Sequence, residues 1–267
     1  AVADPPGSTS NWLDDHLPAL VEFYQQLHQE PELSFEEKVT AARMAGELRQ
    51  LGFEVTEKIG GHGVVGIFRN GAGPTLMLRA DMDGLPVVEQ TGLPYASQVR
   101  VADPRGAVVG VMHACAHEMQ METLVGPLRF LVQHPERWQG TLLALFQPAE
   151  ERGAGAKAML KEGLLQRFPR PDFALAMHVA ADSPAGVVSY RTGYAMANVD
   201  SVDITIRGRG GHGAYPHATL DPIVISALLV LDLKIIVSRE GKPIEPAVVT
   251  VGSIQGGTKH NVISDTC

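Results

Sequence analysis

The sequence predicts an α/β fold followed by a smaller α+β domain, and three observations support this prediction. Strand-length apolar segments alternate with helix-like segments over residues 11–191, which is typical of a largely parallel mixed sheet flanked by helices. Polar clusters follow the carboxyl ends of these strands, where open α/β sheets gather ligands. From about residue 192, a half-exposed alternation and a glycine-rich loop replace this pattern. We therefore expect domains at 11–191 and 192–267, preceded by a flexible tether at 1–10.

The composition narrows the class of protein. The 267 residues are 45% hydrophobic and 19% charged, as in ordinary globular proteins with a substantial core. The net charge of −8 argues against a nucleic-acid partner, and no apolar run reaches the roughly 20 residues of a membrane span. Cys115 and Cys267 are too few for a disulfide framework. The small residues that follow Ala1, with a Pro/Gly/Ser stretch, slightly favour a periplasmic or secreted protein, with the cytoplasm as the alternative.

The elements of the first domain are predicted in order from periodicity and turn residues. An apolar stripe predicts a helix over 12–29. Residues 34–37 form a capping-box pattern, which predicts that a second helix begins there and ends at Leu51, before Gly52. Apolar runs bounded by turn residues predict strands at 53–56, 64–69, 75–80, 107–112, 141–146 and 172–177. Further helices are predicted at 119–134 and 154–162.

The second domain has a different order of elements. Alternation of polar and apolar residues at 201–206 predicts a half-exposed antiparallel strand. A glycine-rich loop at 208–217 leads into a strongly apolar helix predicted at 221–237, and 247–255 is predicted to be another strand. This order of strand, loop, helix and strand indicates an α+β domain.

Residues that can bind metal ions fall at the ends of the predicted strands. The clusters are Asp81/Asp83, His113/Cys115/His117, Glu150/Glu151 and His178. Thiol, imidazole and carboxylate groups are transition-metal ligands, and a catalytic metal site needs about three of them, an open position and a nearby base. The clusters hold more ligands than one open site requires, so a two-metal site is expected, with one glutamate left as the base. Spacing alone leaves open which glutamate has which role.

Each cluster also has a purely structural interpretation. The period of two in His113, Cys115 and His117 would aim all three side chains to one side of an extended backbone, but such a set also fits a buried cysteine beside ordinary histidines. The Glu150/Glu151 pair alone fits the acidic first turn of a helix, and His178 alone fits a hydrogen-bonded core histidine. Asp81 and Asp83 fit turn residues, because Asp before Gly commonly caps or turns. The joint placement of the clusters at strand ends favours the metal site.

Seven stretches of the chain resemble the amidohydrolase branch of the dinuclear-metal aminoacylase/carboxypeptidase family. This branch includes hippurate hydrolases, N-acyl-amino-acid amidohydrolases and the plant hydrolases of indole-acetyl-amino-acid conjugates. The matching stretches are LHQEPELSFEE at 27–37, RADMDGLP at 79–86, EQTGLPYAS at 89–97, MHACAH at 112–117, FQPAEE at 146–151, AMH at 176–178 and KHNVI at 259–263.

The resemblance implies a ligand set and a base. The metal ligands would be Cys115, shared between two ions, with His117, Glu151 and His178 as terminal ligands. The ions would be two divalent metals, zinc or manganese, with cobalt or nickel as further options. Glu150 would be the catalytic general base.

The resemblance also implies supporting and substrate-binding residues. Asp83 would orient a ligand, and His113 would have a supporting position beside the site. His212 and Asn261 match positions that bind substrate or stabilise the tetrahedral oxyanion in relatives. Residues 192–267 would be a ferredoxin-like lid, through which relatives form homodimers.

Departures from the family pattern at three motif positions and at the end of the chain qualify the resemblance. The family usually has Gly, Asp and His where this chain has Ala116, Glu118 and Gln120, which affects the fine geometry of the site. Relatives also continue past 261–263, complete the lid and return to the catalytic domain with another histidine ligand. The resemblance therefore implies that both domains are incomplete in this chain.

The sequence thus predicts a metal-dependent hydrolase. It would cleave the amide bond of N-acyl amino acids or related small conjugates through a metal-activated water, with a glutamate as general base. One alternative is a dipeptidase or carboxypeptidase of the same fold, acting on a peptide-like substrate. The other is a truncated, non-catalytic relative that binds a metal or ligand.

Overall fold

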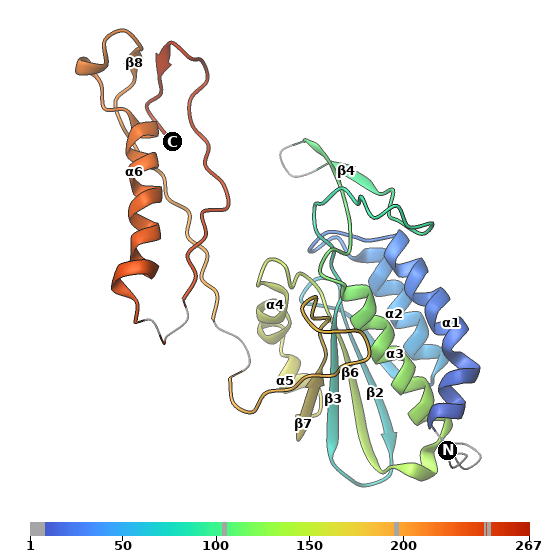
Figure 1. The fold of residues 1–267 in the computed structure, drawn as a ribbon. Helices are drawn as coiled ribbons and strands as arrows, with labels where there is room; N and C mark the ends of the chain where they lie inside the picture. The colour runs from blue at the N-terminus through green and yellow to red at the C-terminus, as the bar shows by residue number, and fades with distance from the viewer. Residues whose placement is uncertain (1–8, 103–105, 195–197, 243, 245–246) are drawn as a thin grey trace. The chain divides into compact units, whose positions relative to one another are not determined.

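The computed structural model describes residues 9–102, 106–194, 198–242, 244 and 247–267. Within it the chain divides into two compact units, Ala1–Val187 and Val188–Cys267, and each is described by itself (Figure 1). The tether predicted at 1–10 lies outside the described residues up to position 8, and its last two residues belong to the first helix. Among the helices of the described ranges, we find none with the length and apolarity that crossing a membrane requires.

The first unit is built on a five-stranded mixed sheet, which confirms the predicted α/β class. In sheet order, the strands are β1 (Glu54–Ile59), β2 (Gly63–Asn70), β6 (Gly140–Gln147), β3 (Thr75–Asp81) and β7 (Phe173–Ala176). β3 runs parallel to both β6 and β7, whereas β2 is antiparallel to β1 and β6. The carboxyl ends of β6, β3 and β7 therefore meet at one edge of the sheet.

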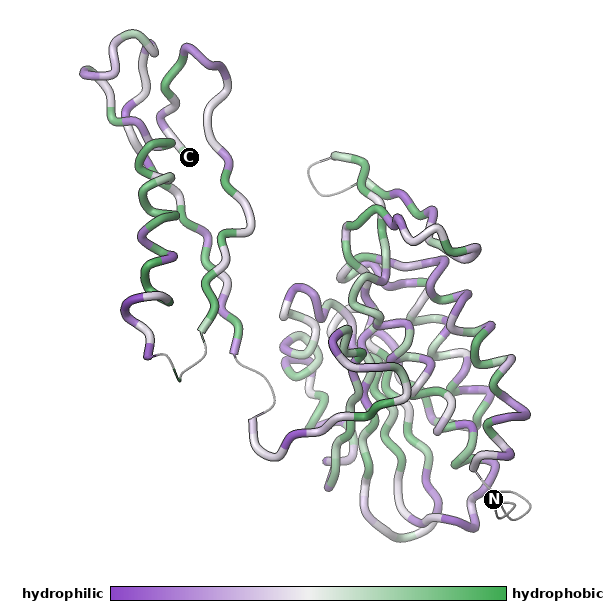
Figure 2. Tube along the Cα trace, in the orientation of Figure 1, coloured by the Kyte–Doolittle hydropathy of each residue, from purple (hydrophilic) through white to green (hydrophobic). Residues whose placement is uncertain are grey.

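Helices cover both faces of this sheet (Figure 1). One face carries α1 (Thr9–Gln29), α2 (Lys38–Gln50) and α3 (His117–Gln133), and the other carries α4 (Gly155–Lys161) and α5 (Leu164–Arg167). Leu27, Met44 and Met121 belong to the larger core cluster, on the first face. Met159 and Leu143 belong to a smaller cluster on the other face. β2 and β6 are apolar along most of their length, as expected for strands that are covered on both faces (Figure 2).

The prediction of a buried strand at 107–112 is wrong, because this segment is not part of the main sheet. This segment contributes only β5 (Val108–Gly110), which pairs with β4 (Arg100–Ala102) in a separate hairpin. Val108 is largely exposed, so the apolar run does not mark a buried strand here. A short run of this kind has no periodicity that distinguishes a sheet core from a hairpin. The turn Pro135–Arg137 precedes β6.

The capping box predicted at 34–37 is also wrong. Helix α2 begins at Lys38, and its first backbone N–H groups are capped by the carboxylate of Glu32, which accepts from Val39 at 3.0 Å and from Thr40 at 2.7 Å. The Ser34 hydroxyl donates instead to Asp83, at 2.6 Å. A tertiary hydrogen bond has therefore replaced the local one that the sequence pattern suggested.

The second unit contains one long helix, α6 (Pro222–Ile235), whose N-terminus is capped by the Asp221 carboxylate. A π-helical turn at Ile236–Glu240 extends it, and a short turn at Pro216–Ala218 precedes it. The paired strands in the described part of this unit are the two-residue β8 (Gly211–His212) and β9 (Val262–Ile263).

The strands predicted at 201–206 and 247–255 are not formed in the second unit. A strand needs a neighbour that satisfies its backbone groups. At the end of the first segment, Ile206 exchanges backbone hydrogen bonds of 2.9 and 3.0 Å with Cys267. The alternation of polar and apolar residues indicated an extended segment at 201–206. Among the described residues, however, no neighbouring strand pairs with this segment to form a sheet.

Candidate metal centre

Three of the four predicted clusters lie at the carboxyl edge of the sheet. Asp81 ends β3, the pair Glu150/Glu151 follows β6, and His178 follows β7. The fourth cluster, His113/Cys115/His117, does not follow a strand of this sheet. Here the chain turns after His113 and begins α3 at His117. The parallel arrangement of β6, β3 and β7 thus places the predicted residues together, and the start of α3 completes the set.

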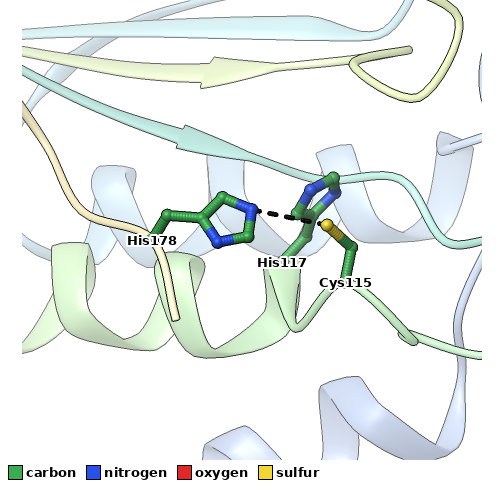
Figure 3. Close-up of side chains that lie close together, drawn as sticks. All are labelled: Cys115, His117 and His178. Carbon is green, nitrogen blue, oxygen red and sulfur yellow. Dashed lines mark hydrogen bonds between the residues drawn. The ribbon is translucent and has the colours of Figure 1, made fainter. Parts of the chain in front are cut away.

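One group consists of Cys115, His117 and His178, whose ligand atoms all lie within 4.8 Å of one another (Figure 3). The sulfur of Cys115 lies 3.3 Å from Nε2 of His178. Nδ1 of His178 lies 2.8 Å from the carbonyl oxygen of Val179, so it is assigned as the protonated nitrogen, and the Nε2 lone pair faces the cysteine. These three residues present one sulfur and two nitrogens toward a common point.

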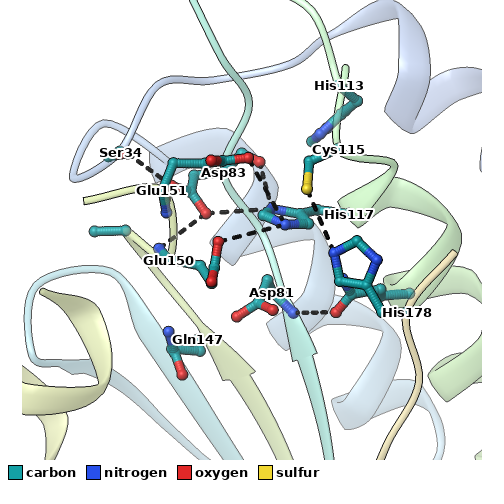
Figure 4. Close-up of polar contacts among 12 residues, drawn as sticks. Ser34, Asp81, Asp83, His113, Cys115, His117, Gln147, Glu150, Glu151 and His178 are labelled. Atoms are coloured by element: carbon teal, nitrogen blue, oxygen red, sulfur yellow. Dashed lines mark hydrogen bonds and ion pairs between the residues drawn. The ribbon is translucent and has the colours of Figure 1, made fainter. Parts of the chain in front are cut away.

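A second group consists of His117, Glu150 and Glu151, again with ligand atoms within 4.8 Å of one another (Figure 4). Nε2 of His117 lies 3.8 Å from a carboxylate oxygen of Glu150 and 4.0 Å from one of Glu151. His117 is common to both groups, so the two sets of ligand atoms share one imidazole. The predicted shared ligand, Cys115, belongs to the first group and interacts electrostatically with Glu151.

Asp83 forms hydrogen bonds with three residues of the site. Its two carboxylate oxygens accept the backbone N–H groups of Glu150 and Glu151, each at 3.1 Å. Its own carbonyl oxygen accepts from Nδ1 of His117 at 2.7 Å, and Ser34 donates to its side chain. Burial acts to raise the pKa of Asp83, but the hydrogen bonds from His117, Ser34 and the two N–H groups lower it below its usual value. Asp83 therefore holds the predicted base Glu150 and the predicted ligand Glu151 through its carboxylate, and the predicted ligand His117 through its carbonyl oxygen.

The donor atoms fit a divalent cation. Nε2 of His117 and Oε1 of Glu151 are buried and have no hydrogen-bond partner among the described residues. Burial and the nearby Glu151 raise the pKa of the Cys115 thiol to about 12, so this thiol needs a cation to become a thiolate. Buried unpaired polar atoms cost free energy unless something occupies the space between them. Sulfur, nitrogen and oxygen in one cluster suit zinc and similar metals.

The three departures from the family motif have structural consequences. Ala116 adopts the left-handed conformation, with φ of 60° and ψ of 39°, which glycine accepts more readily. Gln120 accepts a hydrogen bond from the backbone of Asp81 at 3.2 Å. Glu118 turns away from the ligands and contacts His28 at 2.7 Å.

The expectation that His113, Cys115 and His117 share one extended face is wrong. The backbone turns between them, because Ala116 is left-handed and His117 is already helical. His113 is buried, and its Nδ1 lies 3.8 Å from a carboxylate oxygen of Glu118. It lies beside the site and outside both groups of ligand atoms.

Some residues near the site were not assigned a role from the sequence. Glu37 accepts the backbone N–H of Ala149 at 2.7 Å, and Ala149 is left-handed with φ of 47°. Glu37 thus holds the loop that precedes Glu150, and Ser34 holds Asp83, which binds the backbone of Glu150. The matching stretch 27–37 contained both residues, but their spacing gave no signal for contacts more than 45 positions away along the chain.

The two residues predicted to bind substrate lie in the second unit. His212 is in β8 and pairs with Val262 of β9. The carbonyl oxygen of Asn261 accepts the backbone N–H of Gly213 at 2.8 Å. The β8–β9 pairing therefore brings His212 and Asn261 close together on an exposed loop pair of that unit.

Comparison with known proteins assigns the chain to a protein family. The family described as Peptidase family M20/M25/M40 matches residues 77–258. The chain belongs to this family. The match includes every predicted ligand and the predicted base.

Relatives of this M20 family chain have hydrolytic names. It is 39% identical over 248 residues to N-acetyl-L-cysteine deacetylase of Bacillus subtilis, covering 92% of the chain and 57% of the relative. It is 38% identical over 250 residues to thermostable carboxypeptidase 2 of Saccharolobus solfataricus, covering 92% and 61%. The crystal structure of Bacillus subtilis YXEP protein, described as a dinuclear metal binding peptidase from M20 family, is 30% identical. It aligns with a TM-score of 0.66 over 95% of this chain and 62% of that one. The chain thus spans about three fifths of the length of the relatives it matches.

Proposed function

We propose that this chain is a metal-dependent hydrolase that cleaves the amide bond of N-acyl amino acids or related small conjugates. The observation that carries this is the meeting of two groups of ligand atoms at His117, with the unpaired atoms of His117 and Glu151 facing each other. The family membership and the deacetylase name of one relative support this reaction class. The name carboxypeptidase in another relative keeps peptide substrates as the second candidate.

Two divalent ions would be held by four side chains. The proposed ligands are Cys115, His117, Glu151 and His178. Zinc or manganese is expected, with cobalt or nickel as options. When bound, such ions polarise the substrate carbonyl and lower the pKa of water.

Glu150 has the position of a general base. Its side chain is 41% exposed, whereas that of Glu151 is 18% exposed, so Glu150 is the glutamate that a substrate or water molecule reaches more easily. The bond from its backbone N–H to Asp83 holds the residue in place while the carboxylate stays accessible. The Glu150 carboxylate would take a proton from the attacking water and pass it to the leaving amine.

The second unit would contribute the substrate side of the reaction. We infer that His212 and Asn261 bind the substrate or its oxyanion, as the resemblance implies. The same unit would be the lid of residues 192–267 and would form the homodimer.

The test is Glu150→Gln, which keeps the size of the side chain and removes its basicity. Zn²⁺ content measured by atomic absorption should stay within about twofold of the original chain, while turnover of N-acetyl amino acids should fall by about 10²-fold or more. Glu162→Gln, at the exposed end of α4, is the control and should change neither.

Three outcomes would count against the proposal. Unchanged turnover in Glu150→Gln would remove Glu150 as the base. An original chain that binds Zn²⁺ but hydrolyses neither N-acyl amino acids nor dipeptides would favour the non-catalytic alternative. A rate on dipeptides that exceeds the rate on N-acyl amino acids would favour the peptidase.

A further inference from the structure

A histidine outside the predicted site lies between two buried carboxylates. His28, in the last turn of α1, has Nδ1 at 2.7 Å from Glu118 and Nε2 at 3.0 Å from Glu89. The side chains of His28, Glu118 and Glu89 are 5%, 1% and 0% exposed. Both ring nitrogens can donate at once only when the imidazole is a cation.

The surroundings of His28 favour this cation. Glu118 contributes most, and together with Glu89 it raises the pKa of His28 to about 9, although burial opposes this. The other titratable groups around the imidazole are Tyr24 and Tyr95, whose rings lie 5.8 and 5.5 Å away, and the buried His113. Burial, followed by the charge of Glu118, raises the pKa of Tyr24 to about 12, so this phenol adds no charge near neutrality.

The two carboxylates belong to different parts of the first unit. Glu118 is in the first turn of α3, directly after the ligand His117. Glu89 organises the loop 89–97, because it accepts the backbone N–H of Ser97 at 2.6 Å and the hydroxyl of Thr91. His28 is therefore the link between this loop and the start of the helix that carries His117.

We propose that His28 is a positioning residue, which as a cation joins Glu89 and Glu118 and thereby fixes where the start of α3 presents His117 and Cys115 to a metal ion. The proposal rests on the metal centre of the proposed function. It also gives Glu118 a role, since its carboxylate reaches His28 instead of the ligand atoms. Outer contacts of this kind typically change metal affinity by roughly 10- to 100-fold.

The first experiment measures Zn²⁺ affinity by competition with a chromophoric chelator at pH 7.5. His28→Gln should weaken Zn²⁺ binding by roughly 10-fold or more, because a neutral amide does not replace the cation between two carboxylates. His134→Gln is the matched control, since His134 lies just beyond the other end of α3 and contacts a backbone carbonyl at 2.9 Å. The control should stay within about twofold. Equal affinities of His28→Gln and the original chain would overturn the proposal.

A double-mutant cycle separates positioning from general loss of stability. If His28 acts through Glu118, then His28→Gln combined with Glu118→Gln should bind Zn²⁺ no more weakly than the weaker single variant. Additive losses would show that the two residues act independently and would contradict the proposal. Glu89→Gln should mainly increase hydrogen exchange in 89–97, with a smaller loss of Zn²⁺ affinity than Glu118→Gln.

A measurement on the unsubstituted chain avoids variants that fail to fold. The ¹⁵N shifts of the His28 imidazole should show both nitrogens protonated up to about pH 9. A folded pKa above the ordinary 6.5 stabilises the protein fully below pH 6.5, and this contribution is lost as the pH rises through 9. Titration of His28 near 6.5 would overturn the cationic link. Neither readout uses turnover, so a chain that binds Zn²⁺ without hydrolysis would refute the hydrolase and leave this link standing.

Discussion

The two sides of the candidate metal centre are supported very differently. On one side, His117 and Asp83 are completely buried, and hydrogen bonds join them to each other and to the backbone of Glu150 and Glu151. On the other side, His178 is exposed, and it contacts Cys115, the carbonyl oxygen of Val179 and the edge of the His117 ring. One half of the site is therefore pre-organised, and the other depends on residues at the margin of the unit.

The sheet explains this difference. β3 pairs with β6 over seven residues and β6 pairs with β2 over another seven, so the loops after β3 and β6 leave a well-covered layer. β7 pairs with β3 over four residues, and every residue of β7 is exposed. His178 follows an edge strand, whereas Asp83, Glu150 and Glu151 follow central ones. The position of a strand in the sheet thus determines how firmly the residues that follow it are held.

Asp83→Asn should have the largest effect, because it breaks the buried half. The amide nitrogen would face a backbone N–H of Glu150 or Glu151, leaving a buried donor unsatisfied at about 1–3 kcal/mol. We also expect roughly a 100-fold loss of Zn²⁺ affinity, since both glutamates lose their fixed position. Urea unfolding and chelator competition would measure the two effects.

The matched control is Asp172→Asn. Asp172 also accepts a backbone N–H, that of Thr75 at 2.8 Å, but it does so at the opposite end of β3 and is exposed. It should cost less than about 1 kcal/mol and leave Zn²⁺ affinity unchanged. Equal effects of the two substitutions would show that the buried half has no special role.

The sequence predicted the central part of this arrangement well. The apolar runs at 64–69, 75–80 and 141–146 correspond to β2, β3 and β6, and the polar residues after β3 and β6 do meet at one edge. Period and burial are local properties of a strand, so they can be read from one segment. The meeting of Cys115, His117 and His178 follows from the end of β7 together with the start of α3.

What the sequence could not provide are the contacts between distant segments. Ser34 and Glu37 matched a local capping box, yet they hold Asp83 and the loop at Ala149, because a buried carboxylate and a left-handed turn need those partners more. His28 had no assigned role for the same reason, since Glu89 and Glu118 are 61 and 90 positions away. Hydrogen bonds of this range leave no periodic trace in the sequence.

His178→Ala should have an intermediate effect that separates the two halves. It removes one proposed ligand, so Zn²⁺ affinity should fall by at least about 10-fold. The free energy of unfolding of the metal-free chain should change by less than about 0.5 kcal/mol, because the side chain is exposed. His117→Ala should lose affinity as well and also cost about 2 kcal/mol or more, because it leaves a cavity and an unpaired Asp83 carbonyl. Similar stability losses in both variants would contradict the contrast between the halves.

Ala116→Gly should have the smallest effect and the opposite sign. Ala116 holds φ of 60° between Cys115 and His117, and a left-handed non-glycine residue costs about 1–2 kcal/mol. Glycine removes that cost, while its greater freedom in the unfolded chain offsets about 0.5–1 kcal/mol, so we expect a net stabilisation of about 0.5–1 kcal/mol in urea unfolding. Ala42→Gly, at an exposed position inside α2, is the control and should destabilise by about 1 kcal/mol. If Ala116→Gly destabilises by as much as Ala42→Gly does, then the left-handed turn before His117 carries no strain, and the buried half is held without it.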